Sequence, residues 1–404
     1  MTLTPDQARD AVASLCAPRA AEAVEVTSAL GLVAAAEVTS PVALPPFANS
    51  AMDGFAVRAG DTDGGGVRLR LVGESRAGAP AEGEVTAGTA MRVSTGAAMP
   101  AGADAVVRLE DADDHGDAVT VGAVAPGRDV RPAGDDVARG DVMVPAGRRL
   151  GPGEVAALQA VGLTRVAAHP RPRVAVVATG DETVPAGMPL GPGDVHDSNR
   201  PMLAAQVWHA GGDVVLQASG VPDTLDATAT ALDEALGVAD LVVVAGGVSV
   251  GRHDHVKRAL ALAGVAEVFW RVALRPGHPT WCGRGVVDGR DVVVLGLPGN
   301  PVSAFVTFAL FARPAIRALA GDRAPDVLVP ATYRGPAQAK AAGVVSALRV
   351  ALSPGDPLPV ASPTWGNQRS HSLRSLVGAD GLALVDAGRE ALADGDTVRV
   401  LPLG

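Results

Sequence analysis

The chain has 404 residues, of which 48% are apolar, and this length provides material for roughly two to four domains. Its formal charge of -10 argues against nucleic acid as a partner, and no segment contains the ~18 uncharged apolar residues of a membrane span. The acidic Asp6 near the N-terminus does not fit a signal peptide. The only cysteines, Cys16 and Cys282, lack metal-type spacing, so we expect a reducing cytoplasm and a packing role for Cys282 rather than a nucleophilic one.

Within the first 170 residues, the sequence pattern changes from helical to strand-like and back again. Thr4-Pro5-Asp6-Gln7 combines a capping residue, proline at the first helical position and glutamine at the capping-box position, so a helix begins there. We expect a second helix over residues 22–30 and another over 154–161. Between them, short Val-rich runs predict strands at 67–72, 91–93, 105–109 and 119–121. We therefore predict a β domain, residues 41–126, inserted into an N-terminal α+β domain formed by residues 1–40 and 127–170.

Strand and helix patterns alternate over residues 171–320. The expected strands are 174–178, 214–218, 241–245 and 292–297, and the expected helices are 201–210, 226–236, 254–262 and 303–320. This alternation predicts a parallel sheet covered by helices on both faces, with ligands beyond the carboxyl ends of the strands. Residues 321–404 contain many prolines and strand-like runs at 344–350 and 397–401, which favour a separate C-terminal β domain.

A glycine-rich segment follows the third expected strand of this α/β region. It contains Gly246, Gly247, Val248, Ser249, Val250 and Gly251, and Asp254 comes shortly after it. Bare backbone N–H groups in such a loop suit an anion, and a carboxylate beside it suits a metal held against a phosphate. A glycine pair after a buried strand is also typical of a simple tight turn.

The other strands of this region also end in polar or glycine-containing segments. Thr179-Gly180-Asp181-Glu182 follows the first strand, Asp223 follows the second, and Pro298-Gly299-Asn300-Pro301 follows the fourth. Asp197-Ser198-Asn199-Arg200 precedes the helix at 201–210, and both this stretch and Asp223 would also serve as helix caps. Together these four strand ends predict a ligand site at one edge of the sheet.

Basic residues stand close to the same edge. If residues 271–275 are extended, Arg271, Ala273 and Arg275 share one face, and His278 follows three residues later. Arginine forks bind phosphate or another oxyanion, although the same pattern also fits a solvated edge strand. His253 and His255 flank Asp254, but side chains two apart diverge on a helix, which argues against a histidine metal site.

Five segments of the chain resemble one known family. They are residues 49–57 (NSAMDGFAV), residues 94–97 (STGA) with Pro100, residues 179–182 (TGDE), residues 246–251 (GGVSVG) and residues 297–303 (LPGNPVS). In this order they are similar to the molybdopterin molybdenumtransferases, the bacterial MoeA group that includes the E-domain of gephyrin. The resemblance covers nearly the whole chain.

The resemblance implies an enzyme of molybdenum cofactor synthesis. Its substrates would be molybdate and adenylylated molybdopterin, whose dithiolene sulfurs take up molybdate while AMP is released with the help of Mg²⁺. The family fold is an elongated homodimer with four domains per chain. Each family active site lies between the α/β domain of one subunit and the inserted domain of the other. A molybdopterin adenylyltransferase and recipient molybdoenzymes are implied as partners.

The resemblance also assigns functional residues by motif. The matching functional polar positions, which the resemblance implies are catalytic, are Asp53, Thr95, Asp136, Glu182, Asp223 and Asp254. Of these, Glu182 and Asp254 are the expected metal ligands, and Asp223 is expected on the pterin side. Substrate contacts are expected from Thr179, Gly180, Asp181, Ser198, Asn199, Gly246, Gly247, Ser249, Gly251, Arg271, Arg275, His278, Pro298, Asn300, Pro301, Arg369 and Ser370.

The sequence departs from the family pattern on the basic side of this site. Lysine is usual in the family where this chain has Arg271, Arg275 and His278, and the chain contains only two lysines in all. Arginine keeps the charge but is bulkier, and a histidine is only partly charged near neutral pH. These departures leave open a paralogue that binds or carries molybdopterin without inserting the metal. An adenylyltransferase acting on the same pterin and a gephyrin-type scaffold are further alternatives, and the extra domains argue against the first.

Overall fold

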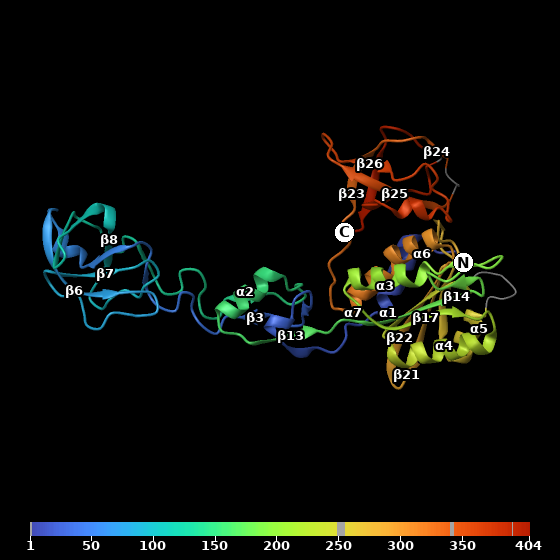
Figure 1. The fold of residues 1–404 in the computed structure, drawn as a ribbon, viewed down its shortest axis with the longest axis horizontal. Coiled ribbons are helices and arrows are strands. Elements are labelled where there is room, and N and C mark those ends of the chain that lie inside the picture. Colours follow the sequence, from blue (N-terminus) through green and yellow to red (C-terminus); the bar gives the residue numbers. More distant parts are fainter. Residues whose placement is uncertain (1, 249–254, 340–342, 390) are drawn as a thin grey trace.

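The computed structural model describes residues 2–248, 255–339, 343–389 and 391–404. The chain is elongated (Figure 1): a β domain lies at one end, a small arm follows it, and the α/β and C-terminal domains form the other end. The predictions that concern Ser249, Gly251, Arg252, His253 and Asp254 lie outside the described residues.

The arm is built from two separate stretches of chain. A three-stranded sheet has the order β1 (Glu22–Glu25), β13 (Arg165–His169), β2 (Val33–Ala34), and β3 (Val38–Thr39) pairs with β12 (Val142–Val144). Helix α2 (Pro152–Ala160) covers a small core that includes Val26, Leu150 and Leu158. At the far end of the arm, β4 (Asn49–Ser50) pairs with β11 (Val130–Arg131).

The helix expected at residues 22–30 is wrong. Those residues form β1 and a short 3₁₀ turn, Val26–Ser28, and β1 pairs antiparallel with β13 over its full length. Residues far along the chain supply this pairing, and burial of Val26 in the arm core fixes the face of the strand. Tertiary pairing therefore overrides a local helical pattern.

Helix α1 (Pro5–Leu15) begins at the expected capping box, with Thr4 and Gln7 bonded to each other's backbone N–H groups. Its apolar face, including Ala8 and Val12, packs into the core of the α/β domain beside α7 (Arg313–Leu319). The structure thus places α1 outside the arm, in contrast to the expected domain of residues 1–40. The physical reason is that the α/β core offers this helix a large apolar surface.

The inserted β domain contains a six-stranded sheet. Its order is β8 (Ala105–Arg108), β5 (Gly54–Val57), β7 (Thr89–Val93), β6 (Val67–Ser75), β10 (Ala118–Val121) and β9 (Ala112–Asp114). Two short 3₁₀ turns, Ala59–Thr62 and Leu109–Asp111, connect strands of this sheet. The four strands expected from the sequence are all present, because their Val and Ala residues alternate into a common core.

The α/β domain has a six-stranded sheet between two helical layers. Four parallel strands lie in the order β17 (Asp213–Val221), β14 (Arg173–Thr179), β18 (Leu241–Ala245), β22 (Arg290–Leu297), and the antiparallel β21 (Trp281–Val287) and β19 (Ala266–Trp270) extend it. Alternate residues of β18 point to opposite faces of the sheet. Val243 packs in the core beneath α1, α3 (Asn199–Ala210), α6 (Pro301–Thr307) and α7. Val244 packs in the core beneath α4 (Leu225–Val238) and α5 (Val256–Leu262). The parallel part was expected; the antiparallel extension was not.

One helical run passes through the centre of this domain. Helix α6 continues through a π-helical turn, Phe308–Ala312, into α7. The run Pro301–Leu319 has a mean hydropathy of 1.4 and is long enough to cross a membrane, but 72% of it is buried inside the protein. It therefore serves as a core helix, in which apolar residues on all sides meet the protein interior.

The C-terminal domain is a closed β structure beside the α/β domain (Figure 1). Its strand order is β20 (Leu274–Arg275), β25 (Val345–Ser353), β26 (Val360–Pro363), β23 (Val329–Tyr333), β29 (Thr397–Pro402) and β27 (Gly381–Val385). A further pairing of β27 with β25 closes this sheet on itself. The short pair β24 (Gln338–Ala339) and β28 (Ala391–Leu392) and a 3₁₀ turn, Leu373–Leu376, complete the domain.

Candidate functional site

Two adjoining cavities open at the carboxyl ends of the parallel strands. The strand-end cavity, about 650 Å³, is formed by the segments that follow β14 and β18, by the start of α3 and by Pro298–Pro301. The interdomain cavity, about 750 Å³, lies between the α/β domain and the C-terminal domain. Because both are lined by Pro279, Pro298 and Asn300, a ligand can occupy the two together.

The strand-end cavity collects most of the residues expected from the four strand ends. It is lined by Thr179, Gly180, Glu182, Ser198, Asn199, Asp223, Gly246, Gly247, Pro298, Asn300 and Pro301. Asp181 does not line the cavity, but its Oδ1 accepts the backbone N–H of the lining residue Asp223 at 3.0 Å. The carboxyl ends of parallel strands meet at one edge of a sheet, so residues far apart in sequence converge here.

Glycine is required where β14 and β18 end side by side. Gly246 has φ 94, and a Cβ on it would lie 2.8 Å from Thr179 Oγ1. At Gly180, with φ 139, a Cβ would lie 2.6 Å from Glu182 Oε2. Both positions use a backbone region and a close approach that a side chain would obstruct.

The start of α3 forms a second wall of the strand-end cavity. Asp197 Oδ1 accepts the Arg200 backbone N–H at 3.1 Å, and its other oxygen accepts Arg200 Nε at 3.1 Å. Asn199 Nδ2 donates to the Gly299 carbonyl at 2.6 Å and ties α3 to the turn after β22. The Oδ1 atom of Asn199 is buried and has no partner among the described residues. Asp197 also lines the cavity, in addition to the capping role expected from the sequence.

The interdomain cavity is lined by basic side chains, whereas the strand-end cavity is lined by acidic ones. Arg275 and His278 reach it from the α/β side, and Arg369, Ser370 and His371 reach it from the C-terminal domain. Its described lining residues include no aspartate or glutamate, whereas Glu182, Asp197 and Asp223 line the strand-end cavity. His278 Nδ1–H donates to the Val272 carbonyl at 2.9 Å, which orients the ring, and this bond does not occupy Nε2.

Three family models together match almost the whole chain. The MoeA N-terminal region (domain I and II) matches residues 3–162, a probable molybdopterin binding domain matches 175–318, and the MoeA C-terminal region (domain IV) matches 337–403. The chain is 37% identical to molybdopterin molybdenumtransferase 2 of Mycobacterium tuberculosis over 94% of each chain. The chain belongs to the MoeA family.

Further comparisons agree with this family. The molybdopterin molybdenumtransferase of Haemophilus influenzae is 32% identical and covers 99% of this chain and 98% of its own length. A MoeA molybdopterin biosynthesis protein from Pyrococcus horikoshii superimposes with a TM-score of 0.85 at 31% identity and covers all of both chains. The resemblance and the multidomain fold expected from the sequence are thus confirmed.

The remaining MoeA motif residues lie away from the two cavities within one chain. Asp53 Oδ1 accepts the Thr95 backbone N–H at 2.7 Å and its Oγ1–H at 3.2 Å. This pair sits in the inserted domain, at the opposite end of the chain from the α/β domain (Figure 1). Asp136 follows both in sequence and lies in the second stretch of the arm, where its N–H donates to the Leu44 carbonyl at 3.0 Å.

Arg271 lines neither cavity. Its guanidinium stacks on the Trp270 ring with Cζ 4.2 Å from the ring centroid, and its φ is 78. Trp270 Nε1–H donates to the Val248 carbonyl at 3.1 Å, so Trp270 packs beside the described part of the glycine-rich segment. The alternation expected for residues 271–275 thus gives exposed Arg271 and Arg275, but only Arg275 reaches a cavity.

Arg349 supports the wall of the interdomain cavity, a role that the sequence does not indicate. The side chain is fully buried in β25, Nε donates to Ser375 Oγ at 3.1 Å, and Nη2 has no partner among the described residues. Burial lowers the pKa of Arg349 to about 10. Its backbone N–H donates to Gln368 Oε1 at 3.0 Å, which anchors the loop that carries Arg369 and Ser370. No local pattern distinguishes a buried arginine in a strand from an exposed one.

Proposed function

We propose that this chain inserts molybdate into adenylylated molybdopterin and releases AMP in the cytoplasm. The observation that carries the proposal is the joining of an acidic cavity to a cationic one at the strand ends. A pyrophosphate with a bridging metal suits the first cavity and a molybdate oxyanion suits the second. Relatives named molybdopterin molybdenumtransferase at 32% and 37% identity support the same reaction. The two cysteines are buried and free, in keeping with a reducing compartment.

The strand-end cavity is assigned to the pyrophosphate and the pterin. The Gly247 N–H cradles phosphate oxygens, Gly246 shapes the turn while its own N–H donates to the Leu297 carbonyl at 3.0 Å, and Asp223 binds on the pterin side. Ser249 and Gly251, outside the described residues, would extend this cradle.

Mg²⁺ is assigned to Glu182 and Asp254, of which Asp254 lies outside the described residues. The described residues contain no cluster of three or more His, Cys, Asp or Glu side chains arranged for a metal. One or two carboxylates with substrate phosphates and water are nevertheless the usual Mg²⁺ environment, so the carboxylate at Glu182 fits. When bound, the ion neutralises charge on the pyrophosphate during release of AMP.

The interdomain cavity is assigned to molybdate. Arg275 and Arg369 approach from opposite domains, so an oxyanion between them receives guanidinium forks from two sides. Ser370 supplies a hydroxyl, and His278 supplies a ring nitrogen whose orientation the Val272 carbonyl holds. Because Arg271 stacks on Trp270, Arg275 carries the cationic role on the α/β side.

The site is completed by a second copy of the chain. Asp53 and Thr95 belong to the inserted domain, which lies at the opposite end of the molecule from the α/β domain (Figure 1), and none of Asp53, Thr95 and Asp136 lines either cavity, so we assign all three to the site of the partner in a homodimer. The substrate would come from a molybdopterin adenylyltransferase, and the product would pass to recipient molybdoenzymes.

The decisive test follows AMP release from purified protein with adenylylated molybdopterin, Mg²⁺ and molybdate. Molybdate-dependent release is expected, with loss in Glu182→Gln and retention in Glu234→Gln, an exposed residue of α4 outside both cavities. Tight pterin binding without release would instead identify a carrier paralogue and overturn the proposal.

Mixed dimers test the shared site. Asp53→Ala and Glu182→Gln each inactivate a homodimer, but a mixed dimer pairs an intact α/β domain with an intact inserted domain at one site. Random mixing then restores about a quarter of wild-type activity. If each chain carried its own complete site, mixing would restore none.

A further inference from the structure

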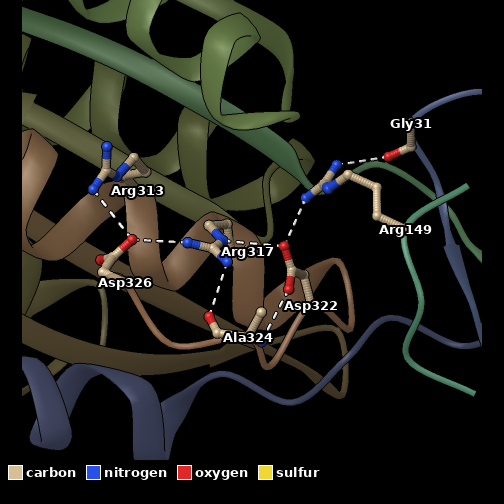
Figure 2. Close-up of polar contacts among 7 residues, drawn as sticks. All are labelled: Gly31, Arg149, Arg313, Arg317, Asp322, Ala324 and Asp326. Atoms are coloured by element: carbon tan, nitrogen blue, oxygen red, sulfur yellow. Dashed lines mark hydrogen bonds and ion pairs between the residues drawn. The ribbon is translucent and has the colours of Figure 1, made fainter. Parts of the chain in front are cut away.

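A buried polar network joins three parts of the chain at the end of the α/β domain opposite the cavities. Figure 2 shows Asp322 between Arg149 of the arm and Arg317 of α7. Asp322 Oδ2 accepts Arg149 Nη2 at 3.0 Å and Arg317 Nε at 3.1 Å, and its Oδ1 accepts the Ala324 N–H at 3.0 Å. Arg149 Nη1 also donates to the Gly31 carbonyl at 2.7 Å. We call the seven residues of Figure 2 the interdomain joint.

The joint also includes Asp326, which lies in the segment that connects α7 to the C-terminal domain. Asp326 Oδ1 accepts Arg317 Nη1 at 2.8 Å and Arg313 Nη2 at 3.2 Å (Figure 2). Arg313 Nη1 donates to the carbonyl of Pro402, in the last strand of that domain, at 2.8 Å. Each charged side chain of the joint thus bonds to a residue outside its own helix, strand or loop.

The two carboxylates of the joint are shielded from water, whereas the Arg149 side chain is 39% exposed and the joint lines a further cavity of about 450 Å³. The Asp322 and Asp326 side chains are 9% and 13% exposed, so water screens these two carboxylates less than it screens surface carboxylates. Burial alone would raise the pKa of Asp322, but bonds from Arg317, Ala324 and Arg149 outweigh it and hold that pKa below its ordinary value. The carboxylate is therefore charged at neutral pH and its pairs are intact.

The joint lies remote from the substrate cavities. Gly321 packs on His169, four residues before β14 begins, and a Cβ on this glycine would lie only 2.3 Å from His169 Cδ2. The joint therefore lies at the amino ends of the strands, whereas the cavities lie at their carboxyl ends. No described joint residue lines either cavity, so the joint can affect the reaction only by placing domains.

Arg149 holds the arm at a third point. Two chain segments cross between the arm and the α/β domain, and they are tied together by the Arg19 carbonyl, which accepts His169 Nδ1–H at 2.6 Å. Two crossing segments alone permit the arm to rotate about the line through them. Arg149 comes from the loop between β12 and α2, which belongs to neither segment, and its bond to Asp322 resists that rotation. Arg171, in the second crossing segment, adds a longer contact to the arm by donating to the Leu30 carbonyl at 3.4 Å.

We propose that Arg149 and Asp322 are positioning residues whose ion pair sets the direction of the arm and thereby aligns Asp53 and Thr95 with the partner's site. The proposal rests on the shared site of the proposed function. The inserted domain lies at the far end of the elongated chain, so a small rotation at the joint displaces it by a larger distance (Figure 1). Misplacement of a catalytic group by about 1 Å is enough to lower a rate on the order of a hundredfold.

The test compares Arg149→Ala with Arg148→Ala in the full-length protein. Arg148 is adjacent, loses the same side chain, and pairs with Glu154 inside the arm at 2.9 Å, without crossing the joint. For Arg149→Ala we expect kcat for AMP release to fall about tenfold or more, with KM for adenylylated molybdopterin changed less than about twofold. Arg149→Lys keeps the charge and should recover part of kcat. Arg148→Ala should match the wild type.

Small-angle X-ray scattering of the same proteins reports the overall shape of the molecule and therefore the direction of the arm. We expect the profile of Arg149→Ala, but not of Arg148→Ala, to differ from that of the wild type. An unchanged kcat in Arg149→Ala beside an active wild type, or identical scattering profiles, would overturn the positioning role. An inactive wild type would refute the proposed function instead, while the scattering comparison would still decide whether the joint directs the arm.

Discussion

Gly246→Ala tests whether the meeting of two strand ends shapes the strand-end cavity. Gly246 has φ 94, and the added Cβ would lie 2.8 Å from Thr179 Oγ1 and 3.1 Å from the Thr179 carbonyl oxygen. The left-handed backbone alone costs about 1–2 kcal/mol for alanine. Crowding against Thr179 adds about 1–3 kcal/mol, because that neighbour includes backbone. We therefore expect a total destabilisation of about 2–5 kcal/mol.

Two other glycines of the same domain separate these contributions. Gly264 has φ 78 and no atom within 4 Å of its Cβ position, so Gly264→Ala should cost only the backbone part, about 1–2 kcal/mol. Gly237, near the end of α4, has open space and no left-handed φ. Gly237→Ala should therefore stabilise the domain by about 0.5–1 kcal/mol.

Differential scanning calorimetry measures the three variants. All three substitutions lie in the α/β domain, so they report on the same unfolding transition. The expected order of stability is Gly237→Ala, wild type, Gly264→Ala, Gly246→Ala. Gly246→Ala should also lose AMP release, because Thr179 lines the cavity. If Gly246→Ala is no less stable than Gly264→Ala, the close approach of the two strand ends is refuted.

Three further predictions concern buried groups. Neither thiol should react with maleimide in the native protein at neutral pH, because burial raises the pKa of Cys16 to about 12 and also raises that of Cys282; labelling before unfolding would contradict this. Asp322→Asn should lower the unfolding temperature at pH 7. The deficit should shrink as the pH falls below about 4, because a carboxylate whose pKa is lowered by folding contributes its full stabilisation above the ordinary aspartate pKa and loses it as the pH falls toward the folded pKa. Arg349→Ala should destabilise the C-terminal domain by about 2–4 kcal/mol in calorimetry, and a change under about 0.5 kcal/mol would refute its support of the loop.

Local patterns correctly predicted most of the α/β domain. Runs such as residues 241–245 are apolar throughout because both faces of a central strand are buried, so the sequence carries a strong signal. The convergence of Thr179, Glu182, Asp223 and Gly246 also followed, since parallel strands place their carboxyl ends at one edge. Their catalytic and metal roles stay predictions.

Other features depended on partners that no local pattern identifies. Residues 22–25 pair with β13 far along the chain, and α1 docks on the α/β core rather than on the arm. The antiparallel strands β21 and β19 extend a sheet whose local pattern indicated only parallel strands.

The amino-acid sequence alone thus established the family, the class of fold, the glycine-rich strand end and the acidic residues that gather beside it. Periodicity and motif spacing are properties of neighbouring residues, so they can be read directly. Only the tertiary structure decided that Arg275 enters a cavity while Arg271 stacks on Trp270, and that Arg149 meets Asp322. The Arg275 cavity and the Arg149–Asp322 pair depend on how distant segments pack together, and such contacts leave no periodic trace in the chain. The stacking of Arg271 accompanies its left-handed backbone, φ 78, which the alternating pattern of residues 271–275 does not indicate.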